Sequence, residues 1–269
     1  MTVRRLLVPL AVVAVLLTGC AADAPHDPPG GPRLPPVGAG LDYQLGGAYD
    51  PPAGVEIVVR DRGAASLDGL YSVCYVNGFQ TQPGELDTWP GDLLLRDSAG
   101  DLVFDPDWPD EAIVDTRKTD EVAAIVGPWI RACAADAFDA VEFDNLDTYT
   151  RSGGALTRAD AVALATRLVE IAHEVGLAAG QKNAAEDAQL FHDRAGFDFA
   201  VVEECASYNE CGAYTAVYGD HVLAVEYPDA LPRPWNDVCA DPATPASIVL
   251  RDRDLATPAD AAYAFATCD

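Results

Sequence analysis

The sequence has few basic residues, and this shortage excludes one class of partner. Lys and Arg number 17 against 43 Asp and Glu, which gives a formal net charge of −26. A surface this acidic repels phosphate backbones, so nucleic acid is not expected as a partner. The same charge would concentrate cations, including a polycationic substrate, although an excess of acid also keeps an exported protein soluble.

Histidine is scarce as well, and the 4 histidines are poorly placed for catalysis or metal binding. His26 falls in a proline-rich stretch, His173 in a predicted helix, and His192 and His221 near the edges of predicted elements. No Ser-His-Asp arrangement can be placed, and no His/Cys group has the spacing of a zinc site. The Asp-rich loops do not match the EF-hand calcium pattern. The sequence therefore predicts no cofactor and no metal.

Long apolar runs are missing beyond the N-terminus, where a short one predicts an export signal. Two arginines precede the run Leu6–Leu17, which is shorter than the roughly 20 residues of a membrane-spanning helix. The run leads into Leu-Thr-Gly-Cys20, the pattern of a bacterial lipobox. We expect a signal peptide over residues 1–19 and a lipid anchor at Cys20, which would hold the protein outside the cytoplasm on the cell membrane. An ordinary signal peptide with an incidental cysteine is the alternative.

The chain beyond the signal divides into a tether and one large domain. Residues 20–40 are rich in Pro and Gly and contain little that could form a core, so an extended, semi-rigid linker is expected. Residues 41–269 have a length that is normal for a single α/β barrel.

The 7 cysteines agree with export. Lipidation of Cys20 would leave six, an even number that suggests up to three disulfides in an exported chain. Cys205 and Cys211 are the nearest pair in the sequence, and we predict that they are bonded. The other four would form Cys239–Cys268 and Cys74–Cys133, or leave the last two as buried free thiols.

Eight short apolar runs predict strands. They lie at 56–61, 70–76, 112–115, 140–144, 177–182, 197–203, 222–227 and 247–252. None shows the polar alternation of a half-exposed sheet, so these runs fit parallel strands that are covered on both faces.

Helical patterns fall between several of these runs. Residues 157–175 carry an apolar stripe at helical spacing, with Thr157 and Asp160 resembling a capping box. Further helices are predicted at 120–134 and at about 258–267. The alternation predicts a single (β/α)8 TIM barrel, with a doubly wound open sheet as the alternative. No glycine-rich nucleotide fingerprint follows the first strand, which favours the barrel.

Potentially catalytic side chains stand at the C-terminal end of nearly every predicted strand. In a TIM barrel these ends converge on one face, where active sites lie. The residues are Asp61, Tyr75, Asn77, Asp115, Asp144, Asn145, Lys182, Asn183, Glu203, Glu204, Glu226, Tyr227, Arg251 and Asp252. Paired carboxylates perform glycoside hydrolysis, because one protonates the leaving oxygen and the other acts as nucleophile or base. Crowding raises the pKa of one carboxyl, so that it keeps its proton near neutral pH.

A series of motifs runs in order from about residue 42 to residue 227. They are Tyr43-Gln-Leu45, Val73-Cys-Tyr75, Asp107-Trp-Pro-Asp-Glu111, Asp139-Ala-Val-Glu-Phe-Asp-Asn-Leu-Asp147, Ala172-His-Glu-Val-Gly-Leu177, Gly180-Gln-Lys-Asn183, Phe197-Asp-Phe-Ala-Val-Val-Glu-Glu-Cys205 and Val225-Glu-Tyr227. The ordered set resembles glycoside hydrolase family 114, the endo-α-1,4-polygalactosaminidases. The resemblance implies a TIM barrel that hydrolyses α-1,4-linked galactosamine polymers, which are cationic where they are deacetylated.

The resemblance also implies roles for individual residues. It places the catalytic carboxylates at Asp144 and Glu203, without deciding which one is the nucleophile. The cleft lining that it implies consists of Asp61, Tyr75, Asn145, Asp147, Lys182, Glu226 and Tyr227. A basic group such as Lys182 beside Asp144 would help to keep that carboxylate ionised.

Two other functions stay open at this point. Val202 and Glu204 depart from the family pattern, which leaves room for a different amino-sugar polymer, such as an acetylated one. A non-catalytic, lipid-anchored carbohydrate-binding protein is the other alternative, although both Asp144 and Glu203 are present. A monomer is expected.

Overall fold

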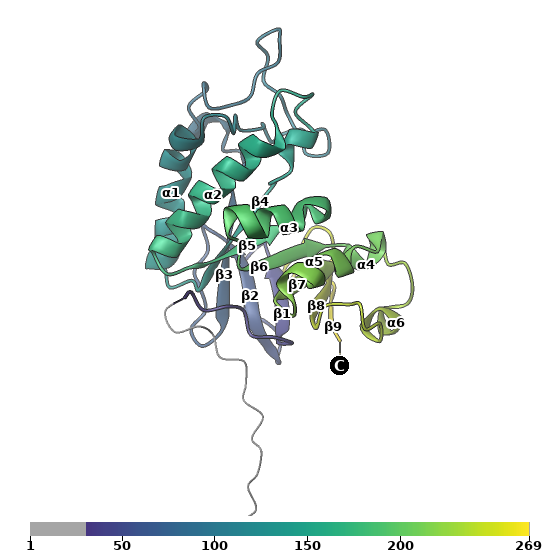
Figure 1. Cartoon of the computed structure of the whole chain (residues 1–269). Coiled ribbons are helices and arrows are strands. Elements are labelled where there is room, and N and C mark those ends of the chain that lie inside the picture. The colour runs from purple at the N-terminus through teal and green to yellow at the C-terminus, as the bar shows by residue number, and fades with distance from the viewer. Residues whose placement is uncertain (1–30, 269) are drawn as a thin grey trace, which may run out of the picture.

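The computed structural model describes residues 31–268, and its centre is one curved sheet (Figure 1). Eight parallel strands follow one another in chain order, and a ninth pairs antiparallel with the eighth. The strands are β1 Gly40–Gln44, β2 Val55–Asp61, β3 Tyr71–Asn77, β4 Ala140–Asp144, β5 Ala178–Lys182, β6 Phe199–Glu203, β7 Val222–Glu226, β8 Ser247–Arg251 and β9 Phe265–Thr267. The sheet curves until β8 lies beside β1, so the predicted α/β barrel is confirmed. Cys20 and the predicted signal peptide lie outside the described residues.

A buried arginine joins the first and last parallel strands. The described sheet has no backbone ladder between β8 and β1. Arg251, the last residue of β8, instead contacts Asp42 Oδ1 of β1 at 2.8 Å and donates to the carbonyl of Tyr43. The carbonyls of Ala256 and Ala264 accept its remaining hydrogen bonds. Arg251 and Asp42 are both fully buried, and the pairing offsets the cost of removing their charges from water.

The two faces of the strands pack in different places. Side chains of alternating residues fill the barrel interior, and they include Tyr43, Val59, Val73, Ala140, Val201 and Val225. The intervening side chains face outward and pack with the helices; they include Val141, Ala179, Val202 and Ala224. Strand side chains alternate with a period of two, so only the inward set reaches the mouth of the barrel.

Two long helices, α1 Thr119–Ala135 and α2 Arg158–Glu174, run side by side on the outer face (Figure 1). α2 begins after Thr157, whose side chain forms the predicted capping box with Asp160. Gly176 follows it at φ +84°, a backbone conformation that glycine adopts without strain. The shorter helices are α3 Ala188–Leu190, α4 Cys205–Tyr208, α5 Cys211–Tyr218 and α6 Trp235–Cys239, with 3-10 turns η1 Leu86–Thr88, η2 Thr148–Thr150 and η3 Ala185–Asp187 and the π turn η4 Phe191–Ala195.

Three sequence predictions of secondary structure were wrong. Residues 112–115 form isolated antiparallel bridges with Gln80, Leu94 and Phe104 in the long connection between β3 and α1, and are not a barrel strand. The eighth parallel strand is instead β1, which was missed because Asp42 and Gln44 make its sequence look polar. Both are buried and hydrogen-bonded. The helix at about 258–267 is replaced by turns and β9.

All three disulfides are present in the described residues. Cys205–Cys211 is confirmed, as is Cys239–Cys268, and Cys74–Cys133 joins β3 to α1. Within residues 31–268, no helix combines the length and the apolar character that crossing a bilayer requires.

The seam between β8 and β1 gives a stability prediction. Replacing Arg251 with Met leaves Asp42 as a buried, unpaired charge, so Arg251→Met is expected to lower the free energy of unfolding by about 3–5 kcal/mol. Urea denaturation with the disulfides intact measures the loss. The control is Arg167→Met, which removes an exposed ion pair with Glu170 and should cost no more than about 1 kcal/mol. Equal effects of the two variants would show that the seam does not depend on Arg251.

Candidate active site

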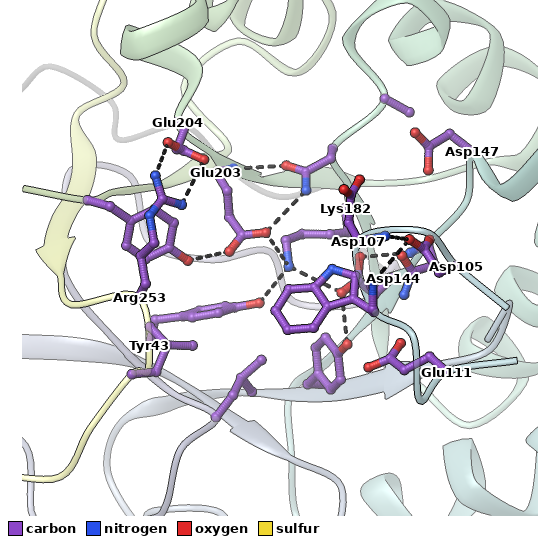
Figure 2. A pocket seen from close by; sticks show the side chains of 18 of the residues that line it. Tyr43, Asp105, Asp107, Glu111, Asp144, Asp147, Lys182, Glu203, Glu204 and Arg253 are labelled. Atoms are coloured by element: carbon purple, nitrogen blue, oxygen red, sulfur yellow. Dashed lines mark hydrogen bonds and ion pairs between the residues drawn. The ribbon is translucent and has the colours of Figure 1, made fainter. Parts of the chain in front are cut away.

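A cleft of about 900 Å³ opens at the C-terminal ends of the strands (Figure 2). Among its lining residues are Asp144 and Glu203 and six of the seven residues predicted to surround them: Asp61, Tyr75, Asn145, Asp147, Lys182 and Tyr227. The strands bring these positions together because the inward-facing set of side chains becomes polar where β2 to β6 end.

Lys182 lies at the centre of this arrangement. It is the last residue of β5 and is almost fully buried. Its ammonium lies 3.4 Å from Asp144 Oδ2 on one side and 3.2 Å from Glu203 Oε2 on the other. The same ammonium also contacts two fully buried side chains: it lies 3.1 Å from Glu142 Oε1 and donates to Tyr43 Oη at 2.8 Å.

The surrounding carboxylates keep Lys182 charged. Burial alone would lower the pKa of Lys182, but Asp144 and Glu203 raise it well above its usual value. Lys182 is therefore a positive charge held between the two carboxylates.

Glu142 is a site residue that the sequence reasoning missed. It is fully buried, and Tyr43 Oη donates to its Oε1 at 2.8 Å. Its Oε2 has no hydrogen-bond partner within residues 31–268. Burial raises the pKa of Glu142 to about 7, against the opposing effect of Lys182. A charged residue two positions before Asp144, on the same face of an apolar strand, was the available signal.

Asp144 is fixed by three donors. Tyr75 Oη donates to its Oδ2 at 2.8 Å, and Lys182 contacts the same oxygen. The backbone N–H of Asn145 donates to Oδ1 at 2.7 Å. Asn145 has φ +63°, a left-handed conformation that Asn tolerates better than most residues. Asp144 therefore has little freedom to change its orientation.

Glu203 is held in a similar way from the other side of the cleft. Asn183 Nδ2 donates to its Oε2 at 3.2 Å, and Tyr227 Oη donates to its Oε1. Asn183 also accepts the backbone N–H of Glu203 through Oδ1 at 2.9 Å. Burial would raise the pKa of Glu203, but Lys182 and the hydrogen bonds from Tyr227 and Asn183 lower it below its usual value.

The shared ammonium limits the distance between the two carboxylates. Asp144 Oδ2 and Glu203 Oε2 lie 3.4 and 3.2 Å from the same nitrogen, so they are at most about 6.6 Å apart, the sum of the two distances. In glycosidases that retain the anomeric configuration the two carboxyl groups are roughly 5–5.5 Å apart, and in inverting enzymes roughly 6.5–9.5 Å.

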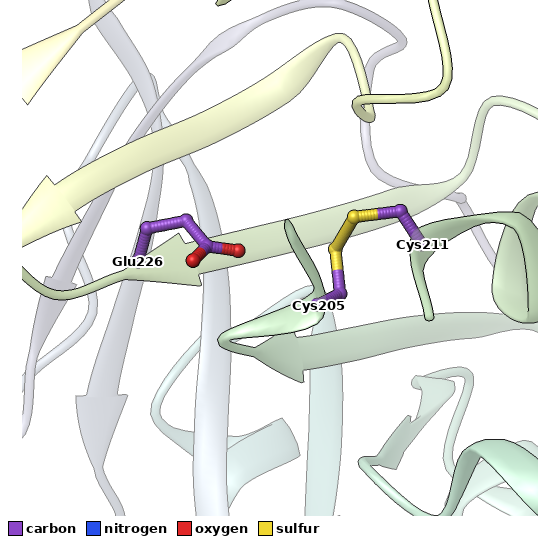
Figure 3. A group of neighbouring side chains, drawn as sticks. All are labelled: Cys205, Cys211 and Glu226. Atoms are coloured by element: carbon purple, nitrogen blue, oxygen red, sulfur yellow. A yellow bond between two sulfur atoms is a disulfide. The ribbon is translucent and has the colours of Figure 1, made fainter. Parts of the chain in front are cut away.

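Glu226 does not lie in the cleft, so the prediction for this residue was wrong. Its side chain points to the outer face of β7, where its Oε1 accepts the backbone N–H of Ala206 at 2.7 Å (Figure 3). Tyr227, one position later, faces inward instead, as a period of two requires. Glu226, Cys205 and Cys211 are close enough to suggest a metal site, but the two sulfurs form a disulfide and offer no thiolate.

The cleft carries a large excess of negative charge. Its lining includes 11 Asp and Glu residues and 3 basic residues. Each basic residue is already paired: Lys182 as above, Arg151 with Asp105 and Asp147, and Arg253 with Glu204 and Asp229. The acids that line the cleft without an ion-pair partner in the described chain are Asp61, Asp107, Glu111, Glu186, Glu210 and Asp254.

Two exposed aromatic side chains also line the cleft, and the sequence reasoning did not single them out. Trp108 lies in the β3–α1 connection and is 59% exposed, and Tyr208 ends α4 and is 66% exposed. Large aromatic side chains left this open on a cleft wall provide flat apolar surfaces for a ligand.

Comparison with known families agrees with this geometry. The model of glycoside-hydrolase family GH114 matches residues 21–269. The chain belongs to this family. It is therefore a glycoside hydrolase, as its strand-end carboxylates predict. A search of curated proteins gave no match.

Two solved structures share the fold. One is the complex of Aspergillus fumigatus Ega3 with galactosamine, with a TM-score of 0.69 and 24% identity over 84% of this chain and 95% of that chain. The other is the glycoside hydrolase domain of PelA from Pseudomonas aeruginosa, with a TM-score of 0.60 and 13% identity over 81% of this chain and 96% of that chain. At these identities the likeness establishes the barrel fold.

Proposed function

We propose that this glycoside hydrolase cleaves α-1,4-linked galactosamine polymers, with Asp144 and Glu203 as its catalytic carboxylates. The observation that supports this most is the acidic cleft, whose own cations are all paired while six of its acids are not. Such a cleft favours a cationic chain over a neutral or acidic one. Ega3, which shares the fold, was solved with galactosamine bound.

The mechanism that fits the geometry is double displacement with retention of configuration. Glu203 donates a proton to the glycosidic oxygen while Asp144 attacks the anomeric carbon, so the carbon–oxygen bond breaks as the bond to Asp144 forms. Glu203 then removes a proton from water, and the resulting hydroxide displaces Asp144 from the sugar. The limit of about 6.6 Å between the two oxygens fits retention and leaves almost no room for the water of an inverting reaction.

The surroundings of each carboxylate support this division of roles. Asp144 is short, fixed by three donors and only 17% exposed, as a nucleophile that attacks along one direction should be. Glu203 is longer and 27% exposed, so it can exchange protons with solvent. Lys182 and the hydrogen bonds from Tyr227 and Asn183 lower the pKa of Glu203 below its usual value, so this carboxyl is mostly ionised at neutral pH. If Glu203 is the acid, cleavage is therefore expected to be faster at acidic pH, where more of it carries the proton that the leaving oxygen needs.

Lining residues outside the carboxylate pair would hold the sugar rings. Trp108 and Tyr208 offer faces on which rings can stack, and they come from different connections of the barrel. Asp61, Asn145, Asp147 and Tyr227 supply polar groups along the cleft. An open cleft lined in this way suits a polymer more than a single sugar.

We also propose the export route predicted from the N-terminus. A signal peptide over 1–19, lipid on Cys20 and a tether over 20–40 would hold the barrel on the outer side of the cell membrane, where the disulfides persist. In a bacterial host the wild type is expected to incorporate a labelled fatty acid, and Cys20→Ser is expected to abolish that labelling. Equal labelling of both forms would contradict the anchor.

The carboxylate assignment is tested by reducing-end release from a deacetylated α-1,4-galactosamine polymer. Asp144→Asn and Glu203→Gln are each expected to lower kcat about 10²–10⁴-fold, because each removes a group that acts at the reacting bond. Glu226→Gln is the matched control, since it changes the same kind of group on the outer face of the barrel. It should leave the rate within a few-fold of wild type.

Release by wild type from the acetylated polymer alone would contradict the proposed substrate. Binding without release from either polymer would favour the carbohydrate-binding alternative. Full activity in either catalytic variant would contradict the assignment of that residue.

A further inference from the structure

Glu111 is a carboxylate in the cleft that the proposed chemistry does not use. It belongs to the connection between β3 and α1, lines the cleft and is 8% exposed (Figure 2). Two neutral side-chain amides hold one of its oxygens: Asn77 Nδ2 donates to Oε2 at 3.2 Å, and Gln80 Nε2 donates to the same atom at 3.0 Å. The carboxyl group is therefore fixed in orientation without being neutralised.

The other oxygen, Oε1, lacks a partner. It receives no hydrogen bond from the part of the chain that the structure describes, and the three basic residues of the cleft form their ion pairs with other carboxylates. Burial raises the pKa of Glu111 to about 7, and the negative charges of Asp144 and Asp110 add to the effect. A buried carboxylate with no cation is costly, so this position favours a cation that arrives with the ligand.

Glu111 is hydrogen-bonded to the strand next to the one that carries Asp144, the proposed nucleophile. Asn77, which holds Glu111, is paired with Asp144 in the register of β3 and β4. Tyr75, two residues earlier on β3, donates to Asp144 Oδ2. Glu111 and Asp144 both line the cleft. In galactosamine the amino group stands on the carbon next to the anomeric carbon, so it is close to the atom that Asp144 is proposed to attack.

We propose that the Glu111 carboxylate binds the protonated 2-amino group of the sugar whose anomeric carbon Asp144 attacks, and so selects residues that are not acetylated. The inference rests on the proposed function and adds the residue that sets its specificity. Acetylation removes the positive charge of the amine and adds an acetyl group, so an acetylated sugar loses this ion pair and brings extra bulk to the same place.

Glu111→Gln tests the proposal with little change in shape. The Gln oxygen can still accept from Asn77 and Gln80, while its amide nitrogen would face the cleft and repel an ammonium. A charge-assisted hydrogen bond contributes about 1.5–3 kcal/mol, so kcat/KM on the deacetylated polymer is expected to fall about 10- to 150-fold. The ratio of kcat/KM on the deacetylated polymer to kcat/KM on the acetylated polymer should fall as well, mainly because the KM for the deacetylated polymer rises.

Asp110→Asn is the matched control. Asp110 is the preceding residue, is exposed and does not line the cleft, so this change removes the same unit of charge from the same loop. It should leave the ratio of the two rates within about twofold of wild type, since surface charges away from the ligand contribute little.

A binding measurement separates an ion pair from a general structural effect. At pH 6 a carboxyl with a pKa of about 7 is mostly protonated, so pairing it with an ammonium must release a proton. Calorimetry of a galactosamine oligomer in buffers of different ionisation enthalpy, in the Glu203→Gln background that slows turnover, should show this release. The added Glu111→Gln change should abolish it.

Three outcomes are distinguishable. A failure of wild type to cleave any galactosamine polymer would overturn the proposed function itself. Normal cleavage by wild type with an unchanged preference in Glu111→Gln would overturn the role of Glu111 alone. A collapse of kcat with unchanged KM and proton release would also overturn it, because Glu111 would then act on the reacting bond and not on the amine.

Discussion

Lys182 brings three carboxylates from neighbouring strands around one buried ammonium. Glu142 and Asp144 belong to β4 and Glu203 to β6, and each lies within 3.4 Å of the Lys182 nitrogen. Without that cation the three acids would repel one another in a half-buried site. The same contact sets the upper limit on the distance between Asp144 and Glu203, and that distance decides which stereochemical course the site can support.

The barrel makes this contact possible because every second side chain of each strand faces its interior. Inward-facing residues of successive strands meet at the mouth of the barrel. Lys182 lies on β5, between β4 and β6, so it contacts Asp144 on one neighbour and Glu203 on the other. From β3, Tyr75 donates to the same Asp144 oxygen that Lys182 contacts. Tyr227, which follows β7, donates to the Glu203 oxygen that Lys182 does not contact. The Arg251–Asp42 pair joins the ends of the sheet and keeps β1, with Tyr43, against Lys182. The seam and the site are thus supported by the same strand.

The sequence predicted which residues line the cleft better than it predicted the elements that carry them. Asp144, Glu203 and Lys182 could be found because strand ends converge in a barrel and because their motifs resemble a known family. Glu226 was misplaced because an apolar run shows where a strand ends but not which of its last two residues faces inward. β1 was missed because its polar residues are satisfied by Arg251 and Arg60, which are distant in sequence. The position of Glu111 in the cleft could not be predicted, because it depends on how the β3–α1 connection folds.

The configuration of the first product tests the central claim most directly, since the claim is that one ammonium holds two carboxylates close enough for double displacement. Proton NMR during the first minutes of hydrolysis of an α-1,4-galactosamine oligomer reports the anomer before mutarotation mixes the two forms. The account predicts that the new reducing end appears first as the α anomer. Initial appearance of the β anomer would contradict it, because a single inversion requires a water molecule between carboxylates roughly 6.5–9.5 Å apart, and Lys182 limits the two oxygens to about 6.6 Å.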